Sequence, residues 1–246
     1  MTIPDTAFRY VPELKGKLIQ PEDSKMRLSM ADFDTIDEKA RKQGRPKPWR
    51  LTHEERNANR KATLAGRMDQ DLWVFSYGSL IWDPSINTTE LRRARTSGHR
   101  RRFCLSQTFD RGSPEHPGLM LGLDEGDPDA FCDAIAMLIP AGQVDIESDY
   151  LWRREMMVGS YVPTFLTTDT PQGGIQALAF CVDRTNPRYV DVPVGDAARM
   201  IAAASGAAGT NTAYLENLVS DLNAVGLHDP DMQRLLEEVH KAVRPS

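Results

Sequence analysis

Cysteine is scarce in this sequence, and what there is offers no disulfide framework. The 246 residues contain three cysteines, Cys104, Cys132 and Cys181, an odd number at wide spacing. Each lies in an apolar run, which predicts buried thiols of the protein core. None has a second cysteine at CxxC spacing, and the five histidines are scattered along the chain. The sequence therefore gives no support for a structural zinc site.

Long apolar runs are also missing. No stretch approaches the roughly 18 apolar residues that a membrane-crossing helix needs, so no membrane association is expected. The opening stretch MTIPDTAFRYVPELKGK has no basic segment followed by an apolar one, and so shows no secretory signal. These features predict a cytoplasmic protein. The hydrophobic fraction of 40% is enough to fill the core of one large domain, or of one domain with an extension.

The glycines do not form either of the common phosphate-binding patterns. Gly122, Gly173, Gly174 and Gly195 fit neither the GxGxxG fingerprint nor the P-loop spacing. Both patterns act by placing backbone N–H groups around a phosphate. The sequence therefore predicts no dinucleotide and no nucleoside triphosphate as a cofactor.

Acidic residues exceed basic ones overall, but not in the first 70 residues. The chain has a net charge of −5, whereas residues 1–70 carry 15 Lys and Arg against 11 Asp and Glu. A basic leader is suited to contact nucleic acid. These charges are mixed in sign, however, and lack the interleaved aromatic residues of a single-strand binder. We expect a solvated extension and no nucleic-acid partner.

The first 70 residues also differ in character from the rest. They are polar, and one glycine and two prolines break any helix within the stretch RKQGRPKPWR. Thr52 followed by Glu55 fits a capping box that opens a short helix through about Leu64. We therefore divide the chain into a polar N-terminal extension, residues 1–70, partly helical or disordered, and a main domain, residues 71–246, that ends in helices.

Apolar segments of strand length begin at Leu72. Gly, Pro and Asp clusters separate them, as strands require. These segments span residues 72–77, 99–109, 119–123, 131–140, 161–168 and 175–182. Helices are predicted at residues 143–157, 196–204, 212–224 and 230–243. Strands first and helices last favour an α+β fold, with a mixed or antiparallel sheet that is able to curl into a barrel.

The segment LWVFSYGSLIW changes character at Gly78. Up to Tyr77 it has the pattern of a buried strand. Gly78 and Ser79 then predict a tight turn, because glycine alone freely adopts positive φ. Such a turn points backbone N–H groups outward as a nest for an anion or an oxyanion, with the Ser79 hydroxyl as a further donor. An ordinary strand-to-loop turn explains the same spacing, and Ser79 lacks the GxSxG context of a nucleophile.

Glu155 is the second candidate because of its place on a predicted helix. Helical periodicity puts it on one face with Val144, Ser148, Leu151, Trp152 and Gly159. A carboxylate held against Leu151 and Trp152 has its pKa raised by desolvation, as a general acid or base requires. The alternatives are a Glu that faces solvent near the helix end, or a structural ion pair with a neighbouring Arg.

Taken together, these motifs resemble the ChaC branch of the γ-glutamylcyclotransferases. Six segments match in order between about Leu72 and Ala224. They are VFSYGSLIW (74–82), RRRF (100–103), RGSPEHPG (111–118), YLWRREMMVGSY (150–161), NPRYV (186–190) and GAAGTNTAYL (206–215). The family's first motif reads VFGYGSLIW, so eight of nine positions agree.

The resemblance implies a cyclotransferase fold, a small twisted mixed β-barrel or sheet flanked by helices. It also implies an enzyme that converts a γ-glutamyl compound to 5-oxoproline, with glutathione as the usual substrate and Cys-Gly as the co-product. The α-amine of the substrate attacks its own γ-carbonyl, so neither a metal nor an organic cofactor is required. Glu155 matches the family's catalytic Glu. The residues expected to hold the γ-glutamyl group are Ser76, Tyr77, Gly78, Ser79 and Leu80.

Three departures from the family pattern bear on specificity. Ser76 replaces the first Gly of the motif, Trp152 stands where Asp is common, and residues 156–160 replace a shorter Gly-rich run. One alternative is therefore the same fold acting on another γ-glutamyl amine or amino acid. A second is a binding protein without catalysis for a γ-glutamyl ligand, and a third is an interaction module that uses the basic leader. The sequence leaves the oligomeric state open.

Overall fold

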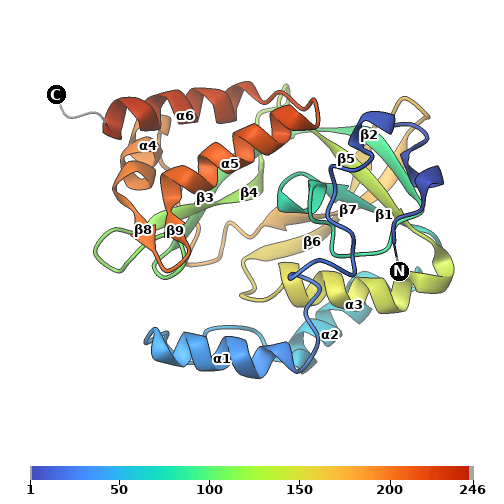
Figure 1. Ribbon diagram of the computed structural model, residues 1–246, viewed down its shortest axis with the longest axis horizontal. Helices are drawn as coiled ribbons and strands as arrows, with labels where there is room; N and C mark the ends of the chain where they lie inside the picture. The colour runs from blue at the N-terminus through green and yellow to red at the C-terminus, as the bar shows by residue number, and fades with distance from the viewer. Residues whose placement is uncertain (1, 244–246) are drawn as a thin grey trace. The chain divides into compact units, whose positions relative to one another are not determined.

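The computed structural model describes residues 2–243 (Figure 1). The chain forms two compact units, and each is built from two separate stretches of sequence. The first unit comprises residues 2–97 and 131–181, and the second comprises residues 98–130 and 182–243. No helix in the described range is long and apolar enough to cross a membrane.

A mixed β-sheet forms the centre of the first unit. Its strands are β1 (Leu72–Ser76), β2 (Glu90–Ser97), β5 (Phe131–Ile139), β6 (Tyr161–Thr168) and β7 (Ile175–Val182). β1 is central, pairing antiparallel with β5 and parallel with β7. β2 pairs antiparallel with β5, and β6 pairs with β7. The α+β fold with a mixed sheet, as predicted from the sequence, is confirmed.

The sheet of the first unit curls but does not close. Arg95 in β2 and Asp169, which follows β6, exchange two backbone hydrogen bonds of 2.9 and 2.8 Å. This single bridge brings the two ends of the sheet close together, and no ladder between β2 and β6 occurs within residues 2–97 and 131–181. Of the two predicted forms, barrel or sheet, the described residues form the open sheet.

Three helices accompany this sheet. They are α1 (Asp32–Lys42), α2 (His53–Thr63) and α3 (Val144–Glu155), and α2 lies beside α3 (Figure 1). α2 begins as predicted, because the Thr52 hydroxyl accepts from the Glu55 N–H at 3.1 Å while the Glu55 carboxylate accepts from the Thr52 N–H at 2.7 Å. Reciprocal bonds of this kind satisfy two of the N–H groups that a helix start leaves without partners.

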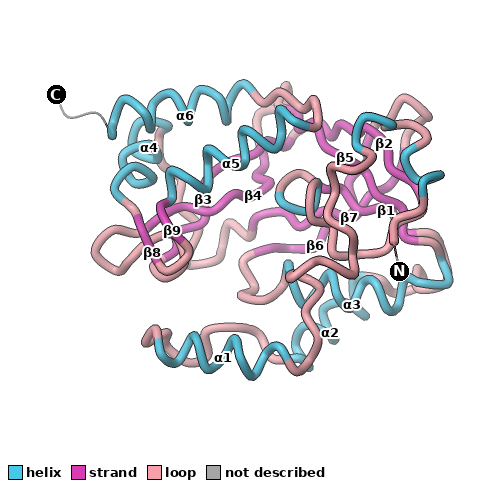
Figure 2. The backbone as a smooth tube through the Cα atoms, in the orientation of Figure 1, coloured by secondary structure: helices cyan, strands magenta, loops and turns pink. Residues whose placement is uncertain are grey.

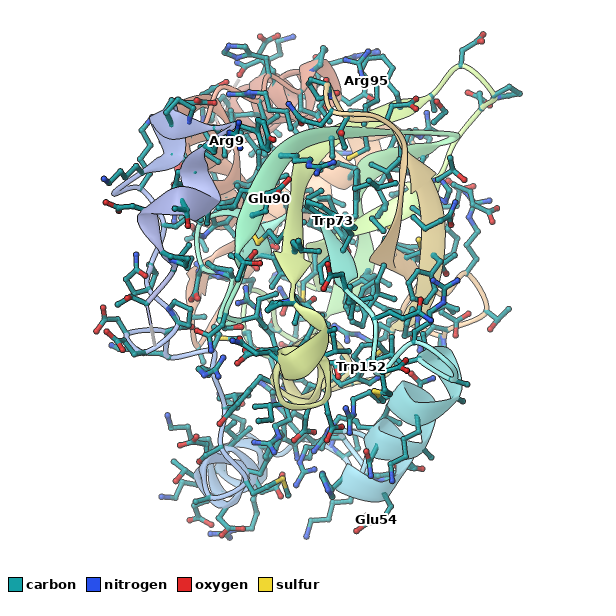
Figure 3. The ribbon with its side chains drawn as sticks, turned by 90° about the vertical axis from the view of Figure 1, so that its right-hand side faces the viewer. Arg9, Glu54, Trp73, Glu90, Arg95 and Trp152 are labelled. Atoms are coloured by element: carbon teal, nitrogen blue, oxygen red, sulfur yellow. The ribbon has the colours of Figure 1, made fainter. Side chains whose placement is uncertain are left out.

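The core between α3 and the sheet is continuous and apolar. Leu72 and Val74 alternate along β1 and meet Leu151 and Trp152 of α3 in one buried cluster. The Trp152 ring also meets Phe180 of β7 nearly edge-on, with ring centroids 5.1 Å apart, in a place that Figure 3 shows beside the sheet. Such aromatic pairs contribute about 0.5–1.5 kcal/mol beyond the area they bury. This packing fixes the position of α3, whose last residue is Glu155.

The second unit combines an antiparallel strand pair with three helices. It contains β3 (His99–Gln107), β4 (Gly118–Glu125), the short hairpin β8 (Ser205–Gly206) and β9 (Gly209–Thr210), α4 (Val194–Ala203), α5 (Asn211–Ala224) and α6 (Pro230–Val243). β3 and β4 form a long ladder with one irregularity after Phe103. Asn211 is fully buried, and its side chain bonds both the N–H and the carbonyl of Leu119.

Two elements differ from the sequence prediction because charged residues dominate them. β2 was not predicted, since its sequence ELRRARTS contains few apolar residues. In the structure the Arg92 guanidinium lies 4.5 Å from the Trp73 ring centroid, so an arginine covers apolar surface that a pattern search expects aliphatic residues to cover. α1 was also not predicted, and it buries only Phe33 and Ala40.

Candidate functional site

The segment VFSYGSLIW runs from β1 into a short helical turn. β1 ends at Ser76, and Gly78 precedes a 3-10 helix, Ser79–Ile81, within the loop that leads to β2 (Figure 2). Gly78 has φ −132° and ψ −137°, so the turn does not use the left-handed conformation that the sequence interpretation invoked. That reason for glycine at this position is wrong. The turn itself is present, closed by the Ile81 N–H donating to the Gly78 carbonyl at 2.9 Å.

The side chains around this turn are largely buried and fixed. The Tyr77 hydroxyl donates to the Phe180 carbonyl at 2.8 Å and so ties the end of β1 to β7. Leu80 belongs to the apolar cluster beneath α3. Ser76 is fully buried, and its hydroxyl has no hydrogen-bond partner among residues 2–243. A buried hydroxyl in this state costs free energy, which makes Ser76 an unusual choice for the end of a core strand.

Glu155 is the last residue of α3, one turn after Trp152. The face that periodicity predicted is buried at Val144, Ser148, Leu151 and Trp152. Glu155 continues this face at the helix end, where 17% of its side chain remains exposed. It is therefore shielded from most of the surrounding water.

Arg154 joins the turn to the carboxylate. Its Nη2 donates to the Ser79 hydroxyl oxygen at 2.8 Å, and its Nε lies 3.0 Å from a carboxylate oxygen of Glu155. Its Nη1 donates to the Asp83 carbonyl and, at 3.2 Å, to the Ser85 hydroxyl. Only 4% of the Arg154 side chain is exposed. Ser79 and Glu155 thus contact neighbouring edges of one planar guanidinium.

Opposing influences set the protonation of Glu155. Burial raises the pKa of the Glu155 carboxyl above its usual range, while the adjacent Arg154 guanidinium acts in the lowering direction, and burial prevails. The neighbouring-Arg ion pair, considered in the sequence as an alternative to a chemical role, is therefore present together with a raised pKa. A carboxylate of this kind takes up a proton more readily than an exposed Glu, which suits a general base.

Sequence reasoning missed Arg154 as a site residue. Helical periodicity placed it at the edge of the apolar face, and a solvated or edge arginine gives no distinctive pattern. The signal that was available is its position directly before Glu155 in the matched YLWRREMMVGSY motif. Trp152 was expected to bear on substrate specificity. The structure places it 1% exposed in the core, where its indole N–H donates to the Asn59 side chain at 2.8 Å.

The structure also bears on metal binding. Within residues 2–243 no group of three or more His, Cys, Asp or Glu side chains is arranged to hold a metal ion. The three cysteines are buried thiols without disulfide bonds, as the sequence predicted.

Family and sequence comparisons match the part of the chain that carries this site. The family model described as "ChaC-like protein" matches residues 72–242. The glutathione-specific gamma-glutamylcyclotransferase of Escherichia coli (strain K12) is 39% identical over 191 residues, which are 76% of this chain and 81% of that protein. Glutathione-specific gamma-glutamylcyclotransferase 1 of Mus musculus is 33% identical over 176 residues, which are 69% of this chain and 78% of that protein.

A solved structure agrees with the fold. The crystal structure of a selenomethionine-labelled γ-glutamyl cyclotransferase specific to glutathione from yeast matches with a TM-score of 0.61 at 22% identity. The match covers 70% of this chain and 97% of that one. At this identity the likeness shows the fold alone. The family match begins at β1, so Ser79, Arg154 and Glu155 lie within it and residues 2–71 lie outside it.

Proposed function

The chain belongs to the ChaC-like family, and from this premise we propose that it is a γ-glutamylcyclotransferase that cleaves glutathione to 5-oxoproline and Cys-Gly. The observation that carries the proposal is the Arg154 guanidinium, which holds the Ser79 turn and the Glu155 carboxylate together. Ser79 and Arg154 lie 75 residues apart in the chain. The fold brings them into contact, which supports the shared site that the family motifs predict.

The reaction needs little covalent help from the protein. The α-amine of the γ-glutamyl group attacks its own γ-carbonyl carbon, a new C–N bond closes a five-membered ring, and the C–N bond to the cysteine nitrogen breaks. Nucleophile and electrophile are tethered in one molecule, so ring closure loses little translational entropy. The enzyme must remove a proton from the attacking nitrogen and supply one to the departing nitrogen, and no water is consumed.

Glu155 is proposed to transfer this proton. In its ionised form it accepts a proton from the attacking ammonium or amine, and as a carboxylic acid it returns that proton to the leaving nitrogen. Burial raises the pKa of Glu155, so the group gains proton affinity, whereas Arg154 keeps the ionised form accessible. One catalytic cycle needs both the ionised and the protonated form of Glu155. Burial favours the protonated form and Arg154 favours the ionised form.

The Tyr77–Leu80 turn is proposed to grip the γ-glutamyl group. The Ser79 hydroxyl oxygen already accepts from Arg154, so its own O–H is available as a donor to substrate. Backbone groups of Gly78 and Leu80 would complete the contact, while the Tyr77 hydroxyl is engaged with Phe180. Ser79 is a hydrogen-bonding group here and not a nucleophile.

Ser76 is proposed to influence which γ-glutamyl compound fits best. Ser76 is the last residue of β1, and its buried hydroxyl has no hydrogen-bond partner in residues 2–243. The second candidate function, the same reaction on another γ-glutamyl amine or amino acid, rests on this residue. The proposed partner is a small molecule. The proposed location is the cytoplasm, which is in keeping with three buried cysteines that form no disulfide bond.

A direct product assay tests the proposal. Purified protein is incubated with glutathione and, separately, with γ-glutamyl-alanine, and 5-oxoproline is measured over time. We expect glutathione to be consumed and Glu155→Gln to lower kcat by roughly 10²-fold or more, because general acid-base catalysis contributes about 10²–10⁴. Glu54→Gln, on the exposed side of α2 (Figure 3), is the matched control and should retain full activity.

The alternatives give different results in the same assay. Turnover of γ-glutamyl-alanine but not of glutathione would favour the second substrate class. Calorimetric binding of glutathione without any 5-oxoproline would identify a binding protein. Near-normal turnover by Glu155→Gln would refute the role given to Glu155 while leaving the activity itself in place.

A further inference from the structure

A segment outside the family match contacts the loop that follows the Ser79 turn. The Ile19 N–H donates to the Trp82 carbonyl at 2.8 Å. The Ser24 hydroxyl donates to the Asp83 carboxylate at 2.5 Å, and Arg27 Nη1 donates to the Ser85 carbonyl at 2.8 Å. Three residues of the N-terminal extension therefore hold three positions of one loop, residues 82–85.

Other groups of the same loop bind Arg154. The Asp83 carbonyl and the Ser85 hydroxyl both accept from Arg154 Nη1. The Asp83 N–H in turn donates to the Ser79 carbonyl at 3.0 Å. The loop thus lies between the extension and the guanidinium that joins Ser79 to Glu155.

Ser85 shows why the loop needs such support. Its φ is +52°, the single positive value among the described non-glycine residues. A residue with a Cβ in this left-handed region costs free energy and persists where surrounding contacts over-determine it. Here Arg27 donates a hydrogen bond to the Ser85 carbonyl oxygen, and Arg154 donates one to the Ser85 hydroxyl oxygen. Loss of either contact removes part of what keeps Ser85 in this conformation.

Arg27 itself is anchored on α3 by a buried carboxylate. Its Nη1 and Nη2 lie 2.6 and 2.9 Å from the two oxygens of Glu147, a residue only 2% exposed. Its guanidinium also stacks on Tyr150, 3.9 Å from the ring centroid. Asn87 donates to Glu147 through both its backbone N–H, at 2.9 Å, and its side-chain amide, at 2.6 Å. Bidentate pairing of this kind fixes a guanidinium in direction as well as position.

We propose that Arg27, held by Glu147, is a positioning residue for the active site, so that the N-terminal extension is a working part of the enzyme. Arg27 fixes Ser85, and the loop of residues 82–85 fixes Arg154, which sets the distance between Ser79 and Glu155. The inference rests on the proposed function for its catalytic consequence. Its structural consequence, a loop that loosens when Arg27 is lost, is independent of which substrate is used.

Three variants of the full chain separate positioning from stability. Arg27→Met keeps an apolar stem but removes the bonds to Ser85 and Glu147. Arg27→Met/Glu147→Gln also removes the buried negative charge that the single change leaves uncompensated, while the glutamine amide oxygen keeps an acceptor for Asn87. Arg60→Met is the control, because Arg60 is also a largely buried arginine of the extension, with 7% of its side chain exposed against 19% for Arg27, and it bonds α3 at Asp145 and Ser148, away from the loop.

Two measurements are made on each variant, steady-state kinetics with glutathione and hydrogen exchange of residues 79–85. For Arg27→Met we expect a lower melting temperature, faster exchange in this segment and a kcat reduced about tenfold or more with KM little changed, since small misplacement of reacting groups is costly. In the double variant the melting temperature recovers, while kcat and exchange do not. Arg60→Met lowers the melting temperature without altering exchange in residues 79–85 or kcat.

Recovery of kcat together with melting temperature in the double variant would overturn the proposal, because Arg27 would then act through stability alone. Unchanged hydrogen exchange of residues 79–85 in Arg27→Met would also overturn the proposal. A wild-type protein that forms no 5-oxoproline from any γ-glutamyl compound would refute the proposed function instead, and the exchange experiment would still decide whether Arg27 orders the loop.

Discussion

Arg154→Met is the most informative single perturbation of the site. The side chain is 4% exposed and contacts Asp83, Ser85, Ser79 and Glu155. Methionine retains most of the stem but none of the donors. Removing one member of a buried charged pair costs about 3–5 kcal/mol, because the other member is left uncompensated. A domain is typically stable by about 5–15 kcal/mol, so we expect the variant to fold with clearly reduced stability.

The loss of stability should depend on pH in a defined direction. Burial raises the pKa of Glu155 and Arg154 acts against that rise, so the variant has a still higher pKa at this carboxyl. A carboxyl whose pKa is raised in the folded state favours folding when protonated, and it loses that contribution as pH rises through the folded-state pKa. The stability deficit relative to wild type is therefore smaller near pH 5 than near pH 8. The acidic limb of the kcat/KM profile should also move to higher pH.

Urea denaturation at the two pH values, together with a pH–rate profile, checks this reasoning. Arg153→Met is a matched control on the same helix turn, since Arg153 bonds Asp149 and the Leu28 carbonyl. We expect the control to lose stability by a similar amount at both pH values and to keep the wild-type acidic limb. An Arg154→Met deficit that is identical at pH 5 and pH 8 would refute the assigned coupling between Arg154 and Glu155.

Three further predictions concern buried groups. Trp152→Phe should lower the free energy of unfolding by about 1–3 kcal/mol, because it removes the bond to Asn59 and leaves a small void; an unchanged urea midpoint would contradict this. Ser76→Ala should be neutral or stabilising, since the hydroxyl has no partner in residues 2–243, and a simultaneous rise in KM would reveal a substrate contact. Burial raises the pKa of the Cys104 thiol to about 12, so iodoacetamide at pH 8 should label Cys104 only after denaturation, as mass spectrometry would report.

The sequence predicted the elements whose patterns depend on local periodicity. α3 was located within one or two residues of its ends, and its buried face at Val144, Leu151 and Trp152 was identified. β5, β6 and β7 were located in the same way, because their apolar runs are bounded by turn residues. Helices and strands of this kind carry their burial pattern in the order of their own residues.

β2 and α1 were missed because their burial depends on partners elsewhere in the chain. In β2, the Arg92 side chain is only 18% exposed, and its guanidinium lies 4.5 Å from the ring centroid of Trp73 in β1. In α1, Phe33 lies beneath the guanidinium of Arg56, 4.4 Å from the ring centroid. An arginine that covers an aromatic ring reads as a polar residue in any sequence window, and only the fold shows that it replaces an aliphatic contact.

The geometry of the Ser79 turn was predicted for the wrong reason. Glycine next to serine suggested a left-handed residue, yet Gly78 has a negative φ and the turn is a single 3-10 turn. Composition identified a break in the strand, but several backbone conformations produce such a break. The choice among them depends on contacts such as Asp83 N–H to the Ser79 carbonyl, which lie outside the motif.

Arg153 and Arg154 show most directly where sequence reasoning ends. They are adjacent and chemically identical, and both lie beside the predicted catalytic Glu155. Successive helix residues differ by about 100° in direction, so Arg153 turns toward the extension at Leu28 while Arg154 turns toward Ser79. Periodicity gave the direction of α3's apolar face but not what lies beyond its two edges. That depends on β1 and the extension packing against α3, so the partner of Glu155 is fixed by tertiary structure although the two residues are neighbours in the chain.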